Sequence, residues 1–308
     1  MDPQLALFIQ QLLNGLKIGS VYSLVALGYT MVYGIIRLIN FAHGDFIMVG
    51  AYAMLFAIPV MIAAGVPAWL AIVPAIVVCV IVGVLVEKAA YKPVREKGNS
   101  MTALITAIAM SLLLENLSQT LFGANPQPMP TFLQVPTFKV GGVTIPGVTL
   151  VTIAIGVVVM VALQMFVKGT KTGKAMRAVS EDKEAATLMG INVNSTITKT
   201  FAIGSGLAAV AALMYCASYP QVTPTLGVML GLKAFVAAVL GGIGSIPGAM
   251  VGGLTIGVVE SLTKAYIGPL TGNLITSAFS DAVVFLILIV VLLVKPSGML
   301  GKNVGEKV

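Results

Sequence analysis

The sequence predicts an all-α membrane protein with about eight or nine transmembrane segments, some of them broken or re-entrant. Of the 308 residues, 58% are hydrophobic and only 9% are charged, whereas soluble domains are about a quarter charged. Apolar runs long enough to cross a bilayer recur along the whole chain. Glycine is abundant, with 33 residues, and small residues let transmembrane helices pack closely. A lipid bilayer is therefore the predicted surrounding of most of the chain.

The apolar runs place the predicted spans. A helix rises 1.5 Å per residue, so a full span takes about 20 residues. The first run is too long for one upright span and too short for two, and Gly15, Lys17, Gly19 and Ser20 interrupt it. The side of the amino terminus and the number of full spans therefore stay open. The runs lie at residues 5–36, 44–63, 68–86, 101–122, 148–167, 198–218, 232–243, 246–263 and 274–294.

Basic residues orient the spans, because segments rich in lysine and arginine stay on the cytoplasmic side. Thirteen of the 18 lysines and arginines fall in residues 87–99, 168–199 and 295–308, which predicts that these segments are cytoplasmic. Residues 123–147 carry only Lys139 and several prolines, which indicates an irregular external segment. The first residues lack a basic leader, so no removable signal peptide is expected.

A broken helix is predicted near the carboxyl end. Residue 231 is predicted to be external and the basic tail cytoplasmic, so the chain must cross the membrane an odd number of times between them. The last three apolar runs supply three crossings. The first two of these are short and are joined by the sequence LGGIGSIPGAM. Irregular backbone at membrane depth is tolerated only where protein or a water-filled cavity covers it, so such helices commonly line a transport pathway.

The restart of this broken helix is well signalled. Ser245 suits an N-cap, and Pro247 fits the first turn, where a missing N–H has no cost. Gly244, Gly248 and Gly252 then recur every four residues. This spacing is typical of tight helix packing, and a role in lining the pathway is compatible with it.

Several function classes are excluded by what the sequence lacks. It has one histidine, no HExxH and no GxSxG motif, so an enzyme is not predicted. The segment GTKTGKA at 169–175 is one residue short of a phosphate loop and lacks its Ser/Thr. Cys79 and Cys216 lie far apart in apolar runs, which indicates buried free thiols and no metal site. The net charge of +7 is explained by membrane topology rather than by nucleic acid; no cofactor is expected.

Ionisable residues inside predicted spans are candidates for function. Glu115 is the deepest clear case, and either a structural hydrogen bond or a pathway role is open for it. Lys233 and Asp281 lie near outer span ends, where their side chains are expected to reach toward water. So few charges in the spans speak against coupling to protons or sodium, and the energy for transport is expected to come from elsewhere.

A second polar cluster falls between the first two spans. Asn40, His43 and Asp45 surround Gly44, which permits a sharp turn. Asp45 is expected to cap or favour the start of the following helix through the helix dipole. A capped interfacial turn and a part in the pathway both remain open for this cluster.

The basic segment 168–199 has an organisation of its own. Ser180 is a good N-cap for a short helix over residues 181–189, and Gly190 fits a left-handed stop. Such a helix exposes the apolar Leu188 and Met189 outside the membrane. An exposed apolar face of this kind indicates a partner with a groove for the helix.

The sequence EAA at 184–186, followed by Gly190, resembles the EAA…G loop of ABC importer permeases, whose short helix docks into an ATPase subunit. The Ile-x-Leu-Pro part of that motif is absent, since Thr200, Phe201 and Ala202 occupy its region. The resemblance implies that this segment couples to the ATPase. The implied coupling residues are Glu184, Ala185, Ala186, Leu188, Met189 and Gly190.

Two longer stretches are similar to the permeases of branched-chain amino-acid ABC importers. These are INFAHGDFIMVGAY at 39–52 and GLKAFVAAVLGGIGSIPGAMVGG at 231–253, with YKPVR at 91–95 and KPSGMLG at 295–301. The resemblance implies a type II importer permease fold, in one transmembrane domain over 1–308, in a bacterial inner membrane. It also implies that the polar turn and the broken helix shape or gate the pathway. The candidate pathway residues are Asn40, His43, Asp45, Glu115, Gly241, Gly242, Gly244, Ser245 and Pro247.

The resemblance further implies a set of partners. These are a second, related permease, two cytoplasmic ATP-binding subunits and an external solute-binding protein, with leucine, isoleucine or valine as the solute. Whether the chain pairs with itself or with another permease stays open. The same family also contains urea and short-amide permeases. An ion-coupled secondary transporter is the alternative from another class, and a membrane-embedded enzyme or scaffold is a third.

Overall fold

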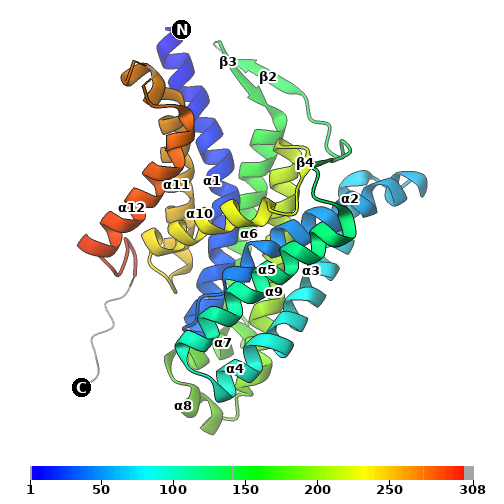
Figure 1. Ribbon diagram of the computed structural model, residues 1–308, viewed down its shortest axis with the longest axis vertical. Helices are drawn as coiled ribbons and strands as arrows, with labels where there is room; N and C mark the ends of the chain where they lie inside the picture. The colour runs from blue at the N-terminus through cyan, green and yellow to red at the C-terminus, as the bar shows by residue number, and fades with distance from the viewer. Residues whose placement is uncertain (1, 141, 273, 302–308) are drawn as a thin grey trace.

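The computed structural model describes residues 2–140, 142–272 and 274–301 (Figure 1). Spanning helices dominate it, with four short strands on one end. The strands form two antiparallel pairs, β1 with β4 and β2 with β3. The elements are α1 (Pro3–Ile36), η1 (Phe41–His43), α2 (Asp45–Ala63), η2 (Ala68–Ala71), α3 (Ile72–Val86), η3 (Glu87–Tyr91), α4 (Lys92–Lys97), α5 (Ser100–Phe122), β1 (Gln127–Pro128), β2 (Thr137–Val140), β3 (Val143–Pro146), α6 (Gly147–Gly169), α7 (Lys171–Glu181), α8 (Lys183–Leu188), α9 (Val193–Ser218), β4 (Gln221–Val222), α10 (Leu226–Gly241), α11 (Ile246–Leu270), η4 (Ser277–Phe279) and α12 (Ser280–Val294).

Among the described residues, eight helices are long and apolar enough to cross a membrane. The ninth apolar helix, α10, has only 16 residues, fewer than the roughly 20 that a full span needs. These observations confirm the prediction of a polytopic helical protein with a broken region. They also place the break where the glycine-rich sequence between α10 and α11 indicates it.

The first apolar run forms one helix of 34 residues. At 1.5 Å per residue α1 is about 50 Å long, which exceeds the roughly 30 Å of a hydrocarbon core. The expectation that glycines interrupt this run is wrong. Gly15 and Gly19 instead face Gly257 and Gly253 of α11, and a Cβ on any of these four would collide with the facing helix. The glycines allow two long helices to approach closely.

The predicted cytoplasmic and external segments lie at opposite ends of the molecule. Figure 1 shows α4, α7 and α8 at one end and the β2–β3 hairpin at the other. The amino-terminal part of α1 reaches the hairpin end, where the Thr144 N–H donates to Gln10 Oε1 at 3.1 Å. The external segment is thus less irregular than the sequence indicates, because a hairpin of two four-residue strands forms in it. Two basic tail residues used for the orientation, Lys302 and Lys307, lie outside the described residues.

The turn between α10 and α11 is held as the sequence predicts. Ser245 caps α11, with its Oγ accepting from the Gly248 N–H at 3.1 Å, and Pro247 lies in the first turn. Gly248 packs against the backbone of Gly241, which confirms the tight packing expected of the repeated glycines. Gly244 differs, because its φ of +93° places it in the left-handed region with open space around it.

The segment after α12 covers the end of α10. The Met299 N–H donates to the Leu240 carbonyl at 2.8 Å, and the Leu300 N–H donates to the Gly241 carbonyl at 3.0 Å. Helix carbonyls that would otherwise lack partners are therefore satisfied by a distant part of the chain. The KPSGMLG sequence at 295–301 thus has a structural role in closing the broken helix.

Candidate functional site

The short helix in the basic segment is α8, and it begins two residues later than predicted. Asp182, not Ser180, is the N-cap; its Oδ1 accepts from the N–H groups of Glu184 and Ala185 at 2.8 and 3.0 Å. Ser180 lies within α7, where its hydroxyl donates to the Arg177 carbonyl. The reason is that Asp182 has an extended backbone, which ends α7 and frees its carboxylate to start α8.

The carboxyl end of α8 exposes two large apolar side chains, as predicted. Leu188 and Met189 are 87% and 82% exposed, while Ala186 points inward and is buried. Gly190 has a φ of +80°, and its N–H donates to the Thr187 carbonyl. This left-handed stop requires glycine. The helix, capped at both ends, is therefore a platform that presents two large apolar side chains away from the protein.

The surface beside α8 carries charges of both signs, because Glu181, Asp182 and Glu184 line the same hollow as two basic residues. Lys183 and Arg37 line a hollow of about 360 Å³ beside α8. Burial lowers the pKa of Lys183, and the nearby positive charges of Arg95 and Arg37 lower it further.

Replacing Asp182 with alanine is expected to loosen α8 without unfolding the membrane part. An N-cap aspartate contributes about 1 kcal/mol to its helix. Amide hydrogen exchange in residues 183–190 should become about five times faster, since RT is about 0.6 kcal/mol, while exchange in the α10–α11 turn stays unchanged. Equal exchange in the two proteins would show that the cap does not hold this helix.

The polar turn before α2 separates into two environments. The Tyr91 hydroxyl donates to Asn40 Oδ1 at 2.7 Å. His43 fills the space beside Gly28, where any added Cβ would collide with the imidazole. Both side chains are buried. They tie α1, η1 and η3 together and do not line the cavity described next.

Gly44, not Asp45, occupies the N-cap position of α2. Asp45 lies in the first turn of this helix, where a negative charge favours the helix start through the dipole, as expected. The carboxylate is only 1% exposed, and neither oxygen has a hydrogen-bond partner among the described residues. Asp45, Ser111 and Glu115 line one cavity of about 560 Å³ between η1, α5 and α10. The other walls of this cavity, called here the apolar cavity, are mainly large apolar side chains. The structure thus brings together two of the predicted pathway residues, Asp45 and Glu115.

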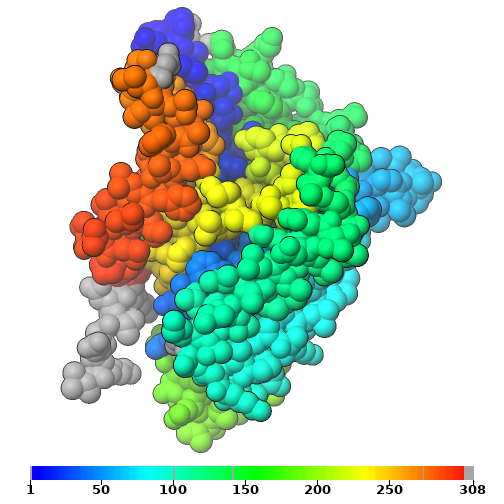
Figure 2. All heavy atoms as spheres, viewed as in Figure 1, coloured from blue at the N-terminus to red at the C-terminus, as the bar shows by residue number. Residues whose placement is uncertain are grey.

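A second cavity, called here the polar cavity, has a volume of about 590 Å³ and lies between α1, α9, α10 and α11. Figure 2 shows the surface hollowed at this place, with α1 behind α10. Residues 226, 230 and 233 of α10 face the polar cavity, whereas residues 228 and 232 face the apolar cavity. Met229 touches both. The short helix α10 is therefore the wall between them.

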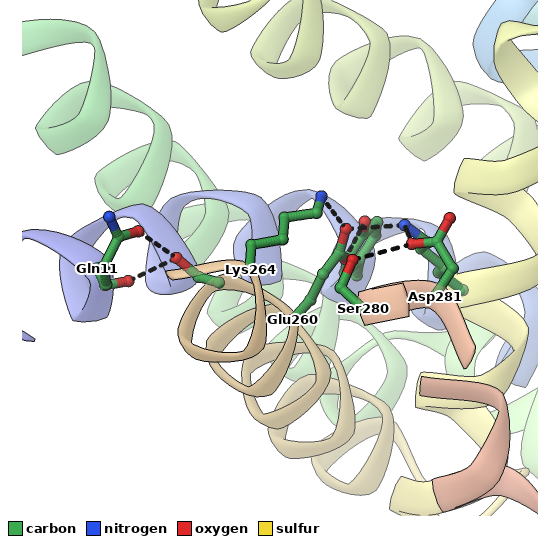
Figure 3. A network of polar contacts seen from close by, with 8 residues as sticks. Gln11, Glu260, Lys264, Ser280 and Asp281 are labelled. Atoms are coloured by element: carbon green, nitrogen blue, oxygen red, sulfur yellow. Dashed lines mark hydrogen bonds and ion pairs between the residues drawn. The ribbon is translucent and has the colours of Figure 1, made fainter. Parts of the chain in front are cut away.

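Charged side chains form a network at the polar cavity (Figure 3). Lys233 Nζ lies 2.7 Å from Glu260 Oε1 and 2.7 Å from Asp281 Oδ1. Lys264 also pairs with Glu260 Oε1, and the Tyr22 hydroxyl donates to Glu260 Oε2 at 2.6 Å. The expectation that Lys233 and Asp281 reach toward water is wrong for Lys233, which is buried and paired on two sides. Four helices, α1, α10, α11 and α12, meet through this network.

Sequence reasoning missed the centre of this network. Glu260 falls inside the apolar run at 246–263 and was not singled out, although Lys264 follows it by four residues. That spacing places the two side chains on one helix face and was the available signal. The contacts from Tyr22 and Lys233 come from distant helices, and no local pattern predicts them.

In the described residues, no group of three His, Cys, Asp or Glu side chains is placed to hold a metal ion. Cys79 and Cys216 are buried free thiols, as expected.

Comparison with known proteins agrees with this picture. A family described as branched-chain amino acid transport system / permease component matches residues 11–292. The high-affinity branched-chain amino acid transport system permease protein LivH of Salmonella typhimurium is 40% identical over 317 residues, which cover 100% of both chains. BraD of Pseudomonas aeruginosa, with the same description, is 41% identical over 315 residues, covering 99% of this chain and 100% of BraD. A probable LivH of Methanocaldococcus jannaschii is 30% identical, covering 90% of this chain and 88% of the relative.

Spanning helices around two cavities, matched over nearly the whole chain by transport permeases, define a multi-pass permease of the inner membrane. The chain belongs to the family of permease components of branched-chain amino acid transport systems. The family predicted from INFAHGDFIMVGAY and the 231–253 stretch is thereby confirmed.

Proposed function

We propose that this chain is the permease subunit of an ATP-driven importer that moves leucine, isoleucine and valine into the cell. Residues 1–308 would act as one transmembrane domain with a cytoplasmic coupling loop over 168–199. The partners are a second, related permease, two cytoplasmic ATP-binding subunits and an external solute-binding protein. The observation that supports this most is the full-length similarity to permeases described as high-affinity branched-chain amino acid transporters.

The coupling role is assigned to α8. The residues involved are Glu184, Ala185, Ala186, Leu188, Met189 and Gly190. Two large apolar side chains in water are unfavourable unless a partner buries them, at roughly 1.5 to 3 kcal/mol each. A rigid helix with a fixed stop suits transmission of movement better than a mobile loop does. The helix-in-groove mode of recognition fits both features.

The pathway role is assigned to the walls of the apolar cavity and to the α10–α11 turn. Asp45 and Glu115 place two carboxylates beside apolar walls, which suits a solute with an ammonium group and an apolar side chain. Asn40 and His43 fix the turn that orients Asp45. Gly241, Gly242, Gly244, Ser245 and Pro247 form the turn on which α10 can move as a gate.

The alternatives differ in what they require of these sites. Urea and short amides carry no ammonium group, so they do not need the two carboxylates of the apolar cavity. An ion-coupled transporter has no use for an exposed apolar platform on the cytoplasmic side. Uptake of labelled leucine, urea and acetamide by the reconstituted transporter distinguishes the proposed function from a urea or short-amide permease. Leucine uptake that persists without ATP would favour the second.

Replacing both Leu188 and Met189 with serine tests the coupling role. The double variant should insert and fold normally, because neither side chain packs inside this chain. The ATP-binding subunits should no longer co-purify with it, and ATP-dependent leucine uptake should fall at least about tenfold, since a loss of only 1.4 kcal/mol in docking gives that factor.

Leu270→Ser is the matched control, since Leu270 is 82% exposed but lies at the opposite end of the molecule. It should bind the ATP-binding subunits as the parent protein does. Normal uptake by the double serine variant would contradict the assignment of α8.

A further inference from the structure

The polar cavity gathers basic residues that the topology does not explain. The sequence predicts that most of the 18 lysines and arginines are cytoplasmic. Within residues 2–140, 142–272 and 274–301, four lysines lie toward the end that carries the β2–β3 hairpin: Lys17, Lys139, Lys233 and Lys264. Three of these four line one cavity. Lysines that orient a membrane protein lie at the cytoplasmic ends of its spans. The three lysines of the polar cavity lie toward the other end, so their presence there needs another explanation.

The charges of the cavity do not cancel. Lys233 and Lys264 are paired with Glu260, and Lys233 is also paired with Asp281. Lys17 takes part in none of the ion pairs found among the described residues. Two carboxylates therefore face three lysines, and one positive charge is left over.

Lys17 is directed into the cavity. Its Nζ lies 5.4 Å from the centre of the Tyr219 ring, a cation–π contact that holds the ammonium without neutralising it. Lys17 follows Gln10, the residue that touches the external hairpin, by about 10 Å along α1. Tyr215, Tyr219 and Gln221 add neutral hydrogen-bonding groups to the same walls. The cavity thus combines an unpaired cation with hydroxyl and amide donors, which is the chemistry that holds a carboxylate.

We propose that the polar cavity is the entry site of the permease and that Lys17 binds the carboxylate of the incoming amino acid. Its volume of about 590 Å³ lies in the range of small-molecule sites. Met229 and Thr225 line both cavities, so a solute held by its carboxylate at Lys17 lies next to the wall of the apolar cavity. The inference rests on the proposed function, because it identifies the group of the solute that this chain recognises first.

The test uses proteoliposomes with the complete transporter and saturating binding protein loaded with labelled leucine. Lys17→Gln should lower the uptake rate about ten- to a hundredfold, the effect of losing one charge-assisted hydrogen bond. Lys17→Arg, which keeps the charge, should retain most of the rate. Lys139→Gln removes an external lysine away from the cavity and should transport as the parent does. Co-purification of the ATP-binding subunits should be equal in all four proteins.

A second measurement identifies the recognised group. Saturation-transfer NMR on the complex without binding protein should show contact of 4-methylpentanoate, which has the carboxylate alone, with the parent and not with Lys17→Gln. 3-Methylbutylamine, which has the ammonium alone, should show no contact that depends on Lys17. Normal uptake by Lys17→Gln, Lys17-dependent binding of the amine, or loss of subunits from Lys17→Gln would each overturn the proposal. Absence of leucine uptake in the parent would instead refute the proposed function, so the two failures are distinct.

Discussion

Replacing Gly257 with leucine is expected to remove most of the folded protein from the membrane. A Cβ at this position would fall on the backbone of Gly19 in α1, not on a flexible side chain. The two helices must then separate along their whole contact, which opens the seam formed by Gly15, Gly19, Gly253 and Gly257. Overpacking typically costs about 1 to 3 kcal/mol and more where backbone is displaced. The measurement is the yield of monodisperse protein after detergent extraction, together with its melting temperature.

Gly169→Leu is the control for this experiment. Gly169 ends α6, and no atom lies within 4 Å of a Cβ placed there. The same increase in side-chain volume should leave yield and melting temperature near those of the parent. If the two leucine variants behave alike, close packing of α1 on α11 does not hold the fold.

Replacing Glu260 with glutamine should give the second large loss. Glu260 is buried and accepts from Lys233, Lys264 and Tyr22. The neutral amide leaves the buried Lys233 with Asp281 alone, and breaking a buried ion pair costs about 3 to 5 kcal/mol. The unfolding free energy in mixed micelles should fall by that amount.

Lys264→Gln provides the comparison within the same network. The Lys264 side chain is 50% exposed, and an exposed ion pair contributes about 0 to 1 kcal/mol. Its unfolding free energy should stay within that amount of the parent value. Equal losses in the two variants would mean that burial does not set the strength of these pairs.

The parts of the molecule that depend on local sequence were predictable. The spans follow from runs of apolar residues, and the Ser245 cap and the Gly190 stop follow from the conformations that these residues favour. The exposed Leu188 and Met189 were predictable for the same reason, since a short helix in water shows its apolar face directly. The error of two residues at the α8 cap arose because Ser180 and Asp182 are both good caps. Local preference alone does not decide between them.

The parts that depend on pairs of distant helices were not predictable from one sequence. From the sequence alone, Gly15 and Gly19 indicate an interruption of the first span. Their packing role becomes evident only when the structure places Gly253 and Gly257 opposite them. From the sequence alone, Lys233 is expected to reach toward water. In the structure, α11 and α12 each bring a carboxylate to it. The network around Glu260 illustrates why, because Glu260 and its partner Tyr22 are separated by 238 residues in the sequence. Such contacts depend on which helices pack together, and the hydropathy of a single sequence does not reveal that.

The position of α10 as a wall shared by two cavities has a mechanical consequence. A sideways movement of this helix would enlarge one cavity and narrow the other, so the two cavities would not widen together. Lys233 is held by ion pairs to α11 and α12 and would act as a pivot partway along the helix. If α10 turns about Lys233, opening one cavity would close the other. The two cavities would then never form a continuous open channel, and no separate gate would be needed on either side.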